Sequence, residues 1–167
     1  SMQDMDYVQS KGADLHRRSL YTYWKRTVAP PMMANFDSAM RESCVVRETR
    51  TNTPLQALNL MNDVTFLEAA RFIAQRIEKE GGATPDERLR YGFKLVAGRL
   101  PSASEEAILR DNLRFGLDYF ASKPERAKSY LSQGDSQASP DLNARELAAY
   151  TSVASLLLNL DETVTKE

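Results

Sequence analysis

Hydrophobic residues recur every three or four positions through most of the chain after residue 60, and this spacing predicts amphipathic helices. The last such run, from about residue 143 to 160, is apolar around most of its circumference. A helix of that kind is surrounded by other helices, so we place it at the centre of a bundle. The inward positions of the three earlier runs are Phe66, Ala70, Ile73 and Ile77; Leu89, Phe93 and Val96; and Leu109, Leu113, Leu117 and Phe120.

Polar start signals precede these runs. In "RTNTPLQALNLMND", residues 50 to 63, Thr53 stands before Pro54 and three residues before Gln56, which is a capping box with proline at the first helical position. The same type of signal recurs at Thr84 with Glu87 and at Ser102 with Glu105. Asn62-Asp63 can close one helix and cap the next, and Gly81-Gly82 ends the helix that follows. The segment "PERAKSYLSQG" predicts a short helix ending at Gly134.

The N-terminal third is less regular. Residues 1–14 are polar and predict a loose lead-in, and Ser1-Met2 resembles the remnant of an expression tag. "LHRRSLYTYWKRTV", Leu15 to Val28, has a helical stripe, although the alternation in "SLYTYW" also fits a strand. Residues 29–49 predict an ordered irregular segment. With no alternating strand-helix pattern, the fold class is all-α: a single-domain bundle of five to seven helices over residues 15–167, with an irregular N-terminal segment.

Composition narrows the function classes. The 167 residues carry a net charge of −1, so no domain-wide positive field attracts nucleic acid. The longest uncharged apolar run, Leu147 to Leu160, is too short for a transmembrane segment. With one cysteine, Cys44, and one histidine, His16, a bound metal would need carboxylate ligands, and we assign neither a metal site nor a catalytic residue.

Basic and aromatic residues concentrate in residues 17–50, which hold seven basic and three acidic residues. Arginine forks match planar oxyanions, so one interpretation is a site for an anion or a sulfated sugar. The other is that the arginines fix the loop to carboxylates and helix carbonyls. The candidate docking or anion-binding residues are Arg17, Arg18, Trp24, Arg26, Arg41, Arg47, Arg50 and Asn52.

Other chemically distinctive residues favour structural roles. Asp161-Glu162 could supply a carboxylate pair for acid/base chemistry, but the preferred interpretation is that these two residues lie at a solvated helix end. His16 has no adjacent nucleophile and is read as a surface residue. Cys44, between Ser43 and Val45, is read as a small buried apolar residue.

Four segments resemble one family: "RRSLYTYWKRTVAPP", "NFD", "RTNTPLQALNLMND" and "LAAYTSVASLLLNLDETVTKE" are similar to the C-terminal half of the planctomycete-type domain of unknown function 1553. The resemblance extends from about Tyr7 to Glu167. One departure is Ala39-Met40, where the family pattern has Pro-Asp, which removes an acidic ligand at that point. Arg41-Glu42 follows the pattern.

The resemblance implies a large exported or periplasmic protein in which haem belongs to an upstream cytochrome c-like module with a CxxCH site. This chain has no such motif, so we expect no cofactor in it. Two hypotheses follow. The preferred one is a non-catalytic scaffold or docking module that binds upstream domains of the same polypeptide through residues 17–52. The alternative is part of an enzyme or binding protein that acts on polysaccharide, with Arg47 and Arg50 contacting anionic groups.

Overall fold

The computed structural model describes residues 12–16, 33, 35–36 and 53–164. These ranges contain a short 3-10 helix and seven α-helices and no strand, which confirms the all-α class. The chain divides into two compact units, residues 1–59 and 60–167, which are described separately.

The 3-10 helix η1 (Gly12–His16) belongs to the first unit, and α2 (Pro54–Asn62) starts in the first unit and ends with its last three residues in the second. The predicted capping box is present: the Thr53 N–H donates to Gln56 Oε1 at 2.9 Å, and the Gln56 N–H donates to Thr53 Oγ1 at 3.3 Å. The Gln56 amide also donates to the Asn35 carbonyl at 2.7 Å. The helix predicted from Leu15 to Val28 and the irregular segment 29–49 fall almost entirely outside the described residues.

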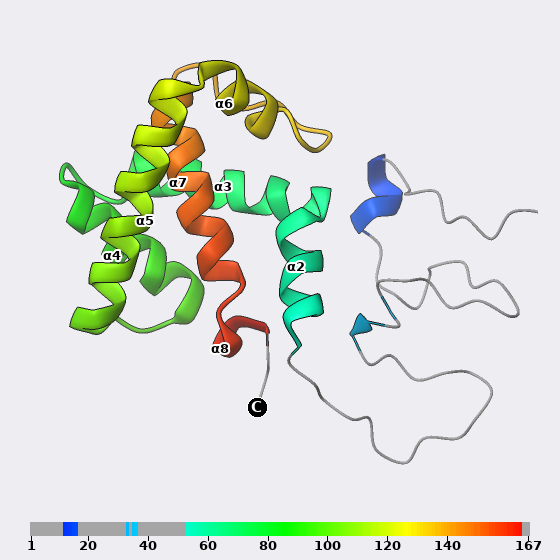
Figure 1. The fold of residues 1–167 in the computed structure, drawn as a ribbon, viewed down its shortest axis with the longest axis horizontal. Coiled ribbons are helices and arrows are strands. Elements are labelled where there is room, and N and C mark those ends of the chain that lie inside the picture. Colours follow the sequence, from blue (N-terminus) through cyan, green and yellow to red (C-terminus); the bar gives the residue numbers. More distant parts are fainter. Residues whose placement is uncertain (1–11, 17–32, 34, 37–52, 165–167) are drawn as a thin grey trace, which may run out of the picture. The chain divides into compact units, whose positions relative to one another are not determined.

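The second unit contains six helices: α3 (Val64–Glu80), α4 (Pro85–Ala97), α5 (Ala103–Ser122), α6 (Pro124–Leu131), α7 (Ala144–Leu158) and α8 (Asp161–Val164). Helix α7 lies between α3 and α5 and packs against both, and α6 packs near its N-terminal end (Figure 1). The apolar C-terminal helix is therefore the centre of the bundle, as its sequence pattern predicted.

The helix ends follow the local signals. Asp63 accepts hydrogen bonds from the backbone N–H groups at the start of α3, and complete capping boxes form at Thr84 with Glu87 and at Ser102 with Glu105. Each cap satisfies backbone donors that the first turn leaves unpaired. The predicted starts of α3, α4 and α5 are confirmed.

The core consists of residues from every predicted inward stripe together with α7. Ala70, Ala74 and Ile77 of α3 are fully buried, as are Val153 and Leu157 of α7. Helices α5 and α7 approach closely at Gly116, where an added Cβ would lie 3.2 Å from both Cα and Cβ of Ala149. A larger residue at Gly116 would force the two helices apart.

Two boundaries differ from the prediction. Helix α6 ends at Leu131 rather than at Gly134, and the Arg71 side chain donates to the carbonyls of Leu131 and Gln133 beyond its last turn. Helix α7 ends at Leu158, and the short helix α8 starts at Asp161. Across the described part of the chain, no helix combines the length and apolarity that a membrane span requires.

Candidate functional site

The sequence-predicted site falls outside the described residues. This is true of every candidate: Arg17, Arg18, Trp24, Arg26, Arg41, Arg47, Arg50 and Asn52. Their role as a docking or anion-binding surface therefore stays a prediction. The Asp161-Glu162 pair can be placed, and Glu162 forms an ion pair with Arg99 at 2.9 Å.

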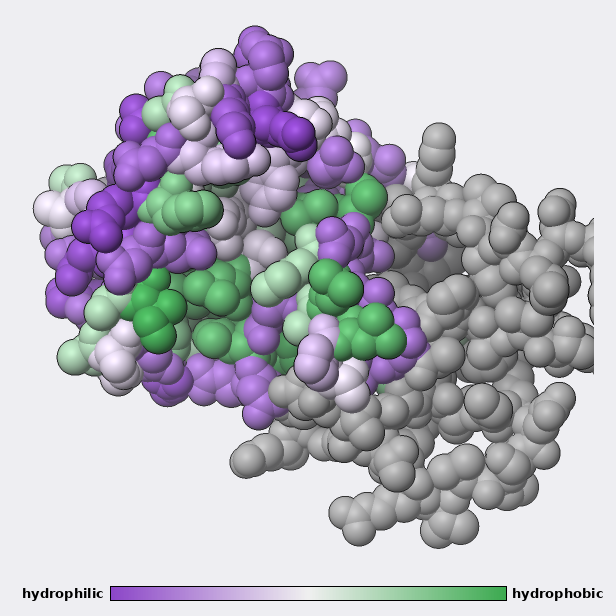
Figure 2. Space-filling model, in the orientation of Figure 1, coloured by the Kyte–Doolittle hydropathy of each residue, from purple (hydrophilic) through white to green (hydrophobic). Residues whose placement is uncertain are grey.

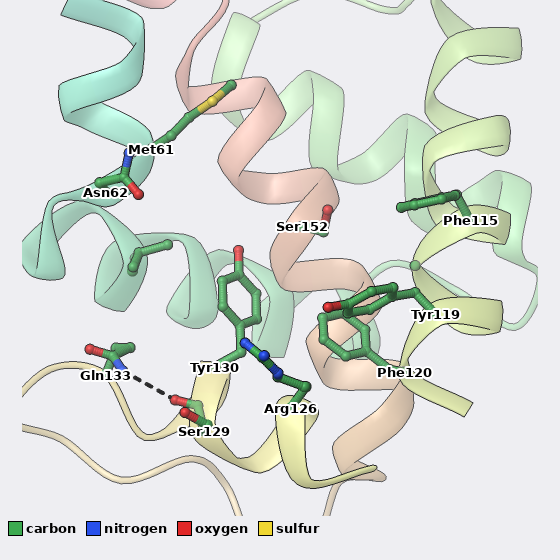
Figure 3. Close-up of a pocket in the computed structure, with 12 residues that line it drawn as sticks. Met61, Asn62, Phe115, Tyr119, Phe120, Arg126, Ser129, Tyr130, Gln133 and Ser152 are labelled. Carbon is green, nitrogen blue, oxygen red and sulfur yellow. Dashed lines mark hydrogen bonds between the residues drawn. The ribbon is translucent and has the colours of Figure 1, made fainter. Parts of the chain in front are cut away.

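The structure instead shows a groove of about 480 Å³ in the second unit. Helices α5, α6 and α7 supply most of its walls, and the end of α2 and the start of α3 complete it (Figure 3). Its lining residues are Met61, Asn62, Leu67, Phe115, Gly116, Tyr119, Phe120, Arg126, Ser129, Tyr130, Gln133 and Ser152.

Four aromatic rings form one wall of the groove. Phe115 and Tyr119, one turn apart on α5, stack with ring centroids 6.1 Å apart; Phe120 meets Tyr119 edge-on at 5.2 Å and stacks with Tyr130 at 5.8 Å. Phe120 is buried, whereas Phe115 is 69% exposed to solvent. The wall thus runs from the core of the bundle out to solvent: Phe115, Tyr119 and Phe120 project from α5 toward α7, and Tyr130 comes from α6 (Figure 3).

Polar groups stand around this wall. The Gln133 amide donates to the Ser129 carbonyl at 3.2 Å, and the Ser152 hydroxyl donates to Asn112 Oδ1 at 3.4 Å. Burial raises the pKa of Tyr130, and its hydrogen bond with Ser155 opposes that change. Arg126, one helical turn before Tyr130 on α6, also lines the groove (Figure 3). The groove therefore combines an apolar wall with a few hydrogen-bonding groups and one cation.

A buried arginine fixes the loop that follows α6. The Arg71 guanidinium, on a residue only 1% exposed, donates to the carbonyls of Leu131, Gln133 and Ser136, the last two at 2.9 and 2.8 Å. Its carboxylate partner, Glu68, lies 3.5 Å away and accepts from the Ser136 N–H at 2.8 Å. The Ser136 hydroxyl bond is the main cause of the lowered pKa of Glu68. Arg71 thereby holds the loop that carries Gln133 into the groove.

A second charged cluster lies outside the groove lining. Burial, and secondly the Glu146 carboxylate, raise the pKa of Glu78 to about 7, while Arg88 acts in the opposite direction. Among the described residues, Glu78 Oε1 is buried without a hydrogen-bond partner. Glu78 is therefore the described carboxyl group most ready to take up a proton near neutral pH.

The described residues do not include a candidate metal site. The described residues contain no group of three or more His, Cys, Asp or Glu side chains placed to hold a metal ion. Several carboxylates are instead paired with arginines, as at Arg90–Glu106, 2.6 Å, and Arg99–Glu105, 2.7 Å. Arg99, followed by the Ser102 cap, lowers the pKa of Glu105 to about 2. These carboxylates are parts of ion pairs and caps.

The sequence contains a signal for the groove that we did not use. Phe115 and Tyr119, which line the groove, stand at i and i+4 on α5 and continue the exposed position Ile108 as a second apolar stripe beside the core stripe of Leu109 and Leu113. Two apolar stripes on one exposed helix indicate a face that is left for another contact.

These features define an all-α domain with an aromatic-walled surface groove. Residues 1–113 match the family described as "PSD1: Protein of unknown function (DUF1553)", and the chain belongs to that family, as the resemblance predicted. The match ends within α5, so most of the groove comes from residues beyond it. No curated protein and no solved structure matches the chain.

Proposed function

We propose that this chain is a non-catalytic docking module of a larger exported protein, and that its groove accepts an apolar side chain from an upstream domain of the same polypeptide. One observation carries the proposal: the aromatic wall ends in Phe115, a large ring that is 69% exposed although the rings behind it are packed. Exposed aromatic surface that continues a buried cluster is typical of interaction sites.

The size of the groove fits such an anchor. A volume of about 480 Å³ suits a few large side chains. Covering a ring such as Phe115 removes on the order of 100 Å² of apolar surface from water, worth roughly 2 kcal/mol at 25 cal/mol per Å². That is enough for one residue to dominate the affinity of a small interface.

The chemistry of the lining supports binding rather than catalysis. Among the described lining residues there is no carboxylate, histidine or cysteine, so the lining offers Ser129 and Ser152 no general base. The remaining parts of the proposal come from the family resemblance. They are an exported or periplasmic location, haem confined to an upstream module, and no cofactor in this chain.

The alternative partner is a sulfated polysaccharide. Rings beside hydrogen-bonding groups such as Asn62 and Gln133 are compatible with a sugar, but a polyanion requires several cations, and among the described residues Arg126 alone is a cation that lines the groove. The groove therefore favours a protein segment.

The test is isothermal titration of this chain with the upstream domains produced as a separate protein. We expect saturable binding that Phe115→Ala weakens by about tenfold or more, since roughly 2 kcal/mol corresponds to about thirtyfold. Ile108→Ala is the matched control: Ile108 is 60% exposed on the same helix and does not line the groove. Absence of binding, or equal losses in both variants, would refute the proposal. A rise in melting temperature with sulfated but not neutral oligosaccharides would favour the polysaccharide instead.

A further inference from the structure

Arg126 differs from every other arginine in the described part of the chain. Nine arginines lie between residues 53 and 164, and eight have a hydrogen bond or ion pair through the guanidinium: Arg71, Arg76, Arg88, Arg90, Arg99, Arg110, Arg114 and Arg145. Within the described residues, the guanidinium of the ninth, Arg126, has no hydrogen-bond or ion-pair partner, and Arg126 lines the groove.

The surroundings leave this charge uncompensated. None of the described residues that line the groove is acidic. The adjacent Glu125 pairs with Lys128 at 3.2 Å. A second cation, Lys123, lies with Nζ 4.6 Å from the ring centroid of Tyr119, at the aromatic wall. This end of the groove therefore presents positive charge directly beside apolar rings.

We infer that the groove selects an acidic peptide segment, in which an aromatic or large aliphatic side chain stands next to a carboxylate. This inference rests on the proposed docking function and adds the chemistry of the partner. The apolar side chain packs on Phe115 and Tyr119, and the carboxylate accepts hydrogen bonds from Arg126, whose planar fork matches its two oxygens. A single unpaired guanidinium matches a single carboxylate in charge.

The charge complementarity also gives a reason for the unpaired state of Arg126. An arginine already paired within its own domain would have to lose that partner before it could bind a ligand carboxylate. An unpaired one gives up only water, so it discriminates between charged and neutral ligands at lower cost.

The experiment uses three blocked tetrapeptides that share Leu-Phe in the middle and carry glutamate, glutamine or lysine at both ends. Each is titrated into the ¹⁵N-labelled chain and followed by amide chemical shifts. At low salt we expect the glutamate peptide to bind about two- to fivefold more tightly than the glutamine peptide, the range of an exposed ion pair, and the lysine peptide to bind most weakly. The shifts should centre on Phe115, Tyr119 and Arg126.

Two variants of equal charge locate the effect. Arg126→Gln should make the glutamate and glutamine peptides bind equally, whereas Arg114→Gln, at a 78% exposed side chain paired with Asp111 and outside the groove lining, should keep the preference. Equal binding of the three peptides, no binding of any, or equal effects of the two variants would overturn the inference. If the upstream domains still bound in a Phe115-dependent way, the docking function would stand without it.

Discussion

Replacing Arg71 with methionine tests how the loop after α6 is held. Methionine fills much of the volume of the arginine stem, so the change removes hydrogen bonds and charge and leaves little cavity. It strands the carbonyls of Leu131, Gln133 and Ser136 in or near the core, and it leaves Glu68 without its cation.

The expected cost is large for a single substitution. Breaking a buried ion pair by removing one partner costs about 3–5 kcal/mol, because the remaining charge and acceptors are buried unpaired. Glu68 keeps its bonds from Ser136, which places the expected loss near the lower end, about 3 kcal/mol. For a domain whose free energy of unfolding is roughly 5–15 kcal/mol, this is a substantial fraction.

Urea unfolding followed by far-ultraviolet circular dichroism measures this loss directly. The matched control is Arg76→Met, five residues along α3, where the Arg76–Glu80 pair is exposed, screened by solvent, and its loss should change the free energy of unfolding little. If Arg71→Met lowered the free energy of unfolding no more than Arg76→Met, the loop would be held by something other than Arg71.

Three further changes can be measured in the same assay. Because the folded-state pKa of Glu78 is about 7, the folded protein binds more protons than the unfolded chain between about pH 4.5 and 7. The free energy of unfolding should therefore fall by about 1–2 kcal/mol as the pH rises from about 4.5 to 7, after allowance for solvent screening. Glu78→Gln should remove this fall. A pH profile that is the same in the variant and the parent would contradict the assignment to Glu78. Gly134→Ala should cost about 1–3 kcal/mol, because φ is +95° and the new Cβ would lie 2.7 Å from Glu68 Cδ; a neutral result would contradict this. Thr84→Ala should cost about 1 kcal/mol through loss of the α4 cap, and Thr84→Ser, which keeps the hydroxyl, should restore most of it.

Much of the fold could be predicted because its signals are local. The caps at Thr53, Thr84 and Ser102 each depend on residues three positions apart, so the sequence contains the whole interaction. The central position of α7 follows from its apolar circumference, since such a helix must be covered on all sides.

The missed features depend on contacts between distant residues. The hydrogen bond from Arg71 to the Leu131 carbonyl at the end of α6 joins residues sixty positions apart, and no local signal records it. The groove was missed because the exposure of Phe115 depends on where α6 and α7 stop covering α5. Sequence reasoning directed attention to residues 17–52 by composition alone, and that candidate site lies outside the described residues.

The close approach of α5 and α7 at Gly116 has a kinetic consequence. With backbone and Cβ of Ala149 only 3.2 Å from the position of a Gly116 Cβ, the walls that α5 and α7 contribute to the groove have no room to slide toward each other. A partner therefore meets walls already in their final positions and needs no slow rearrangement before it docks. Differences in affinity among partners should then appear mainly as differences in residence time, with similar rates of association.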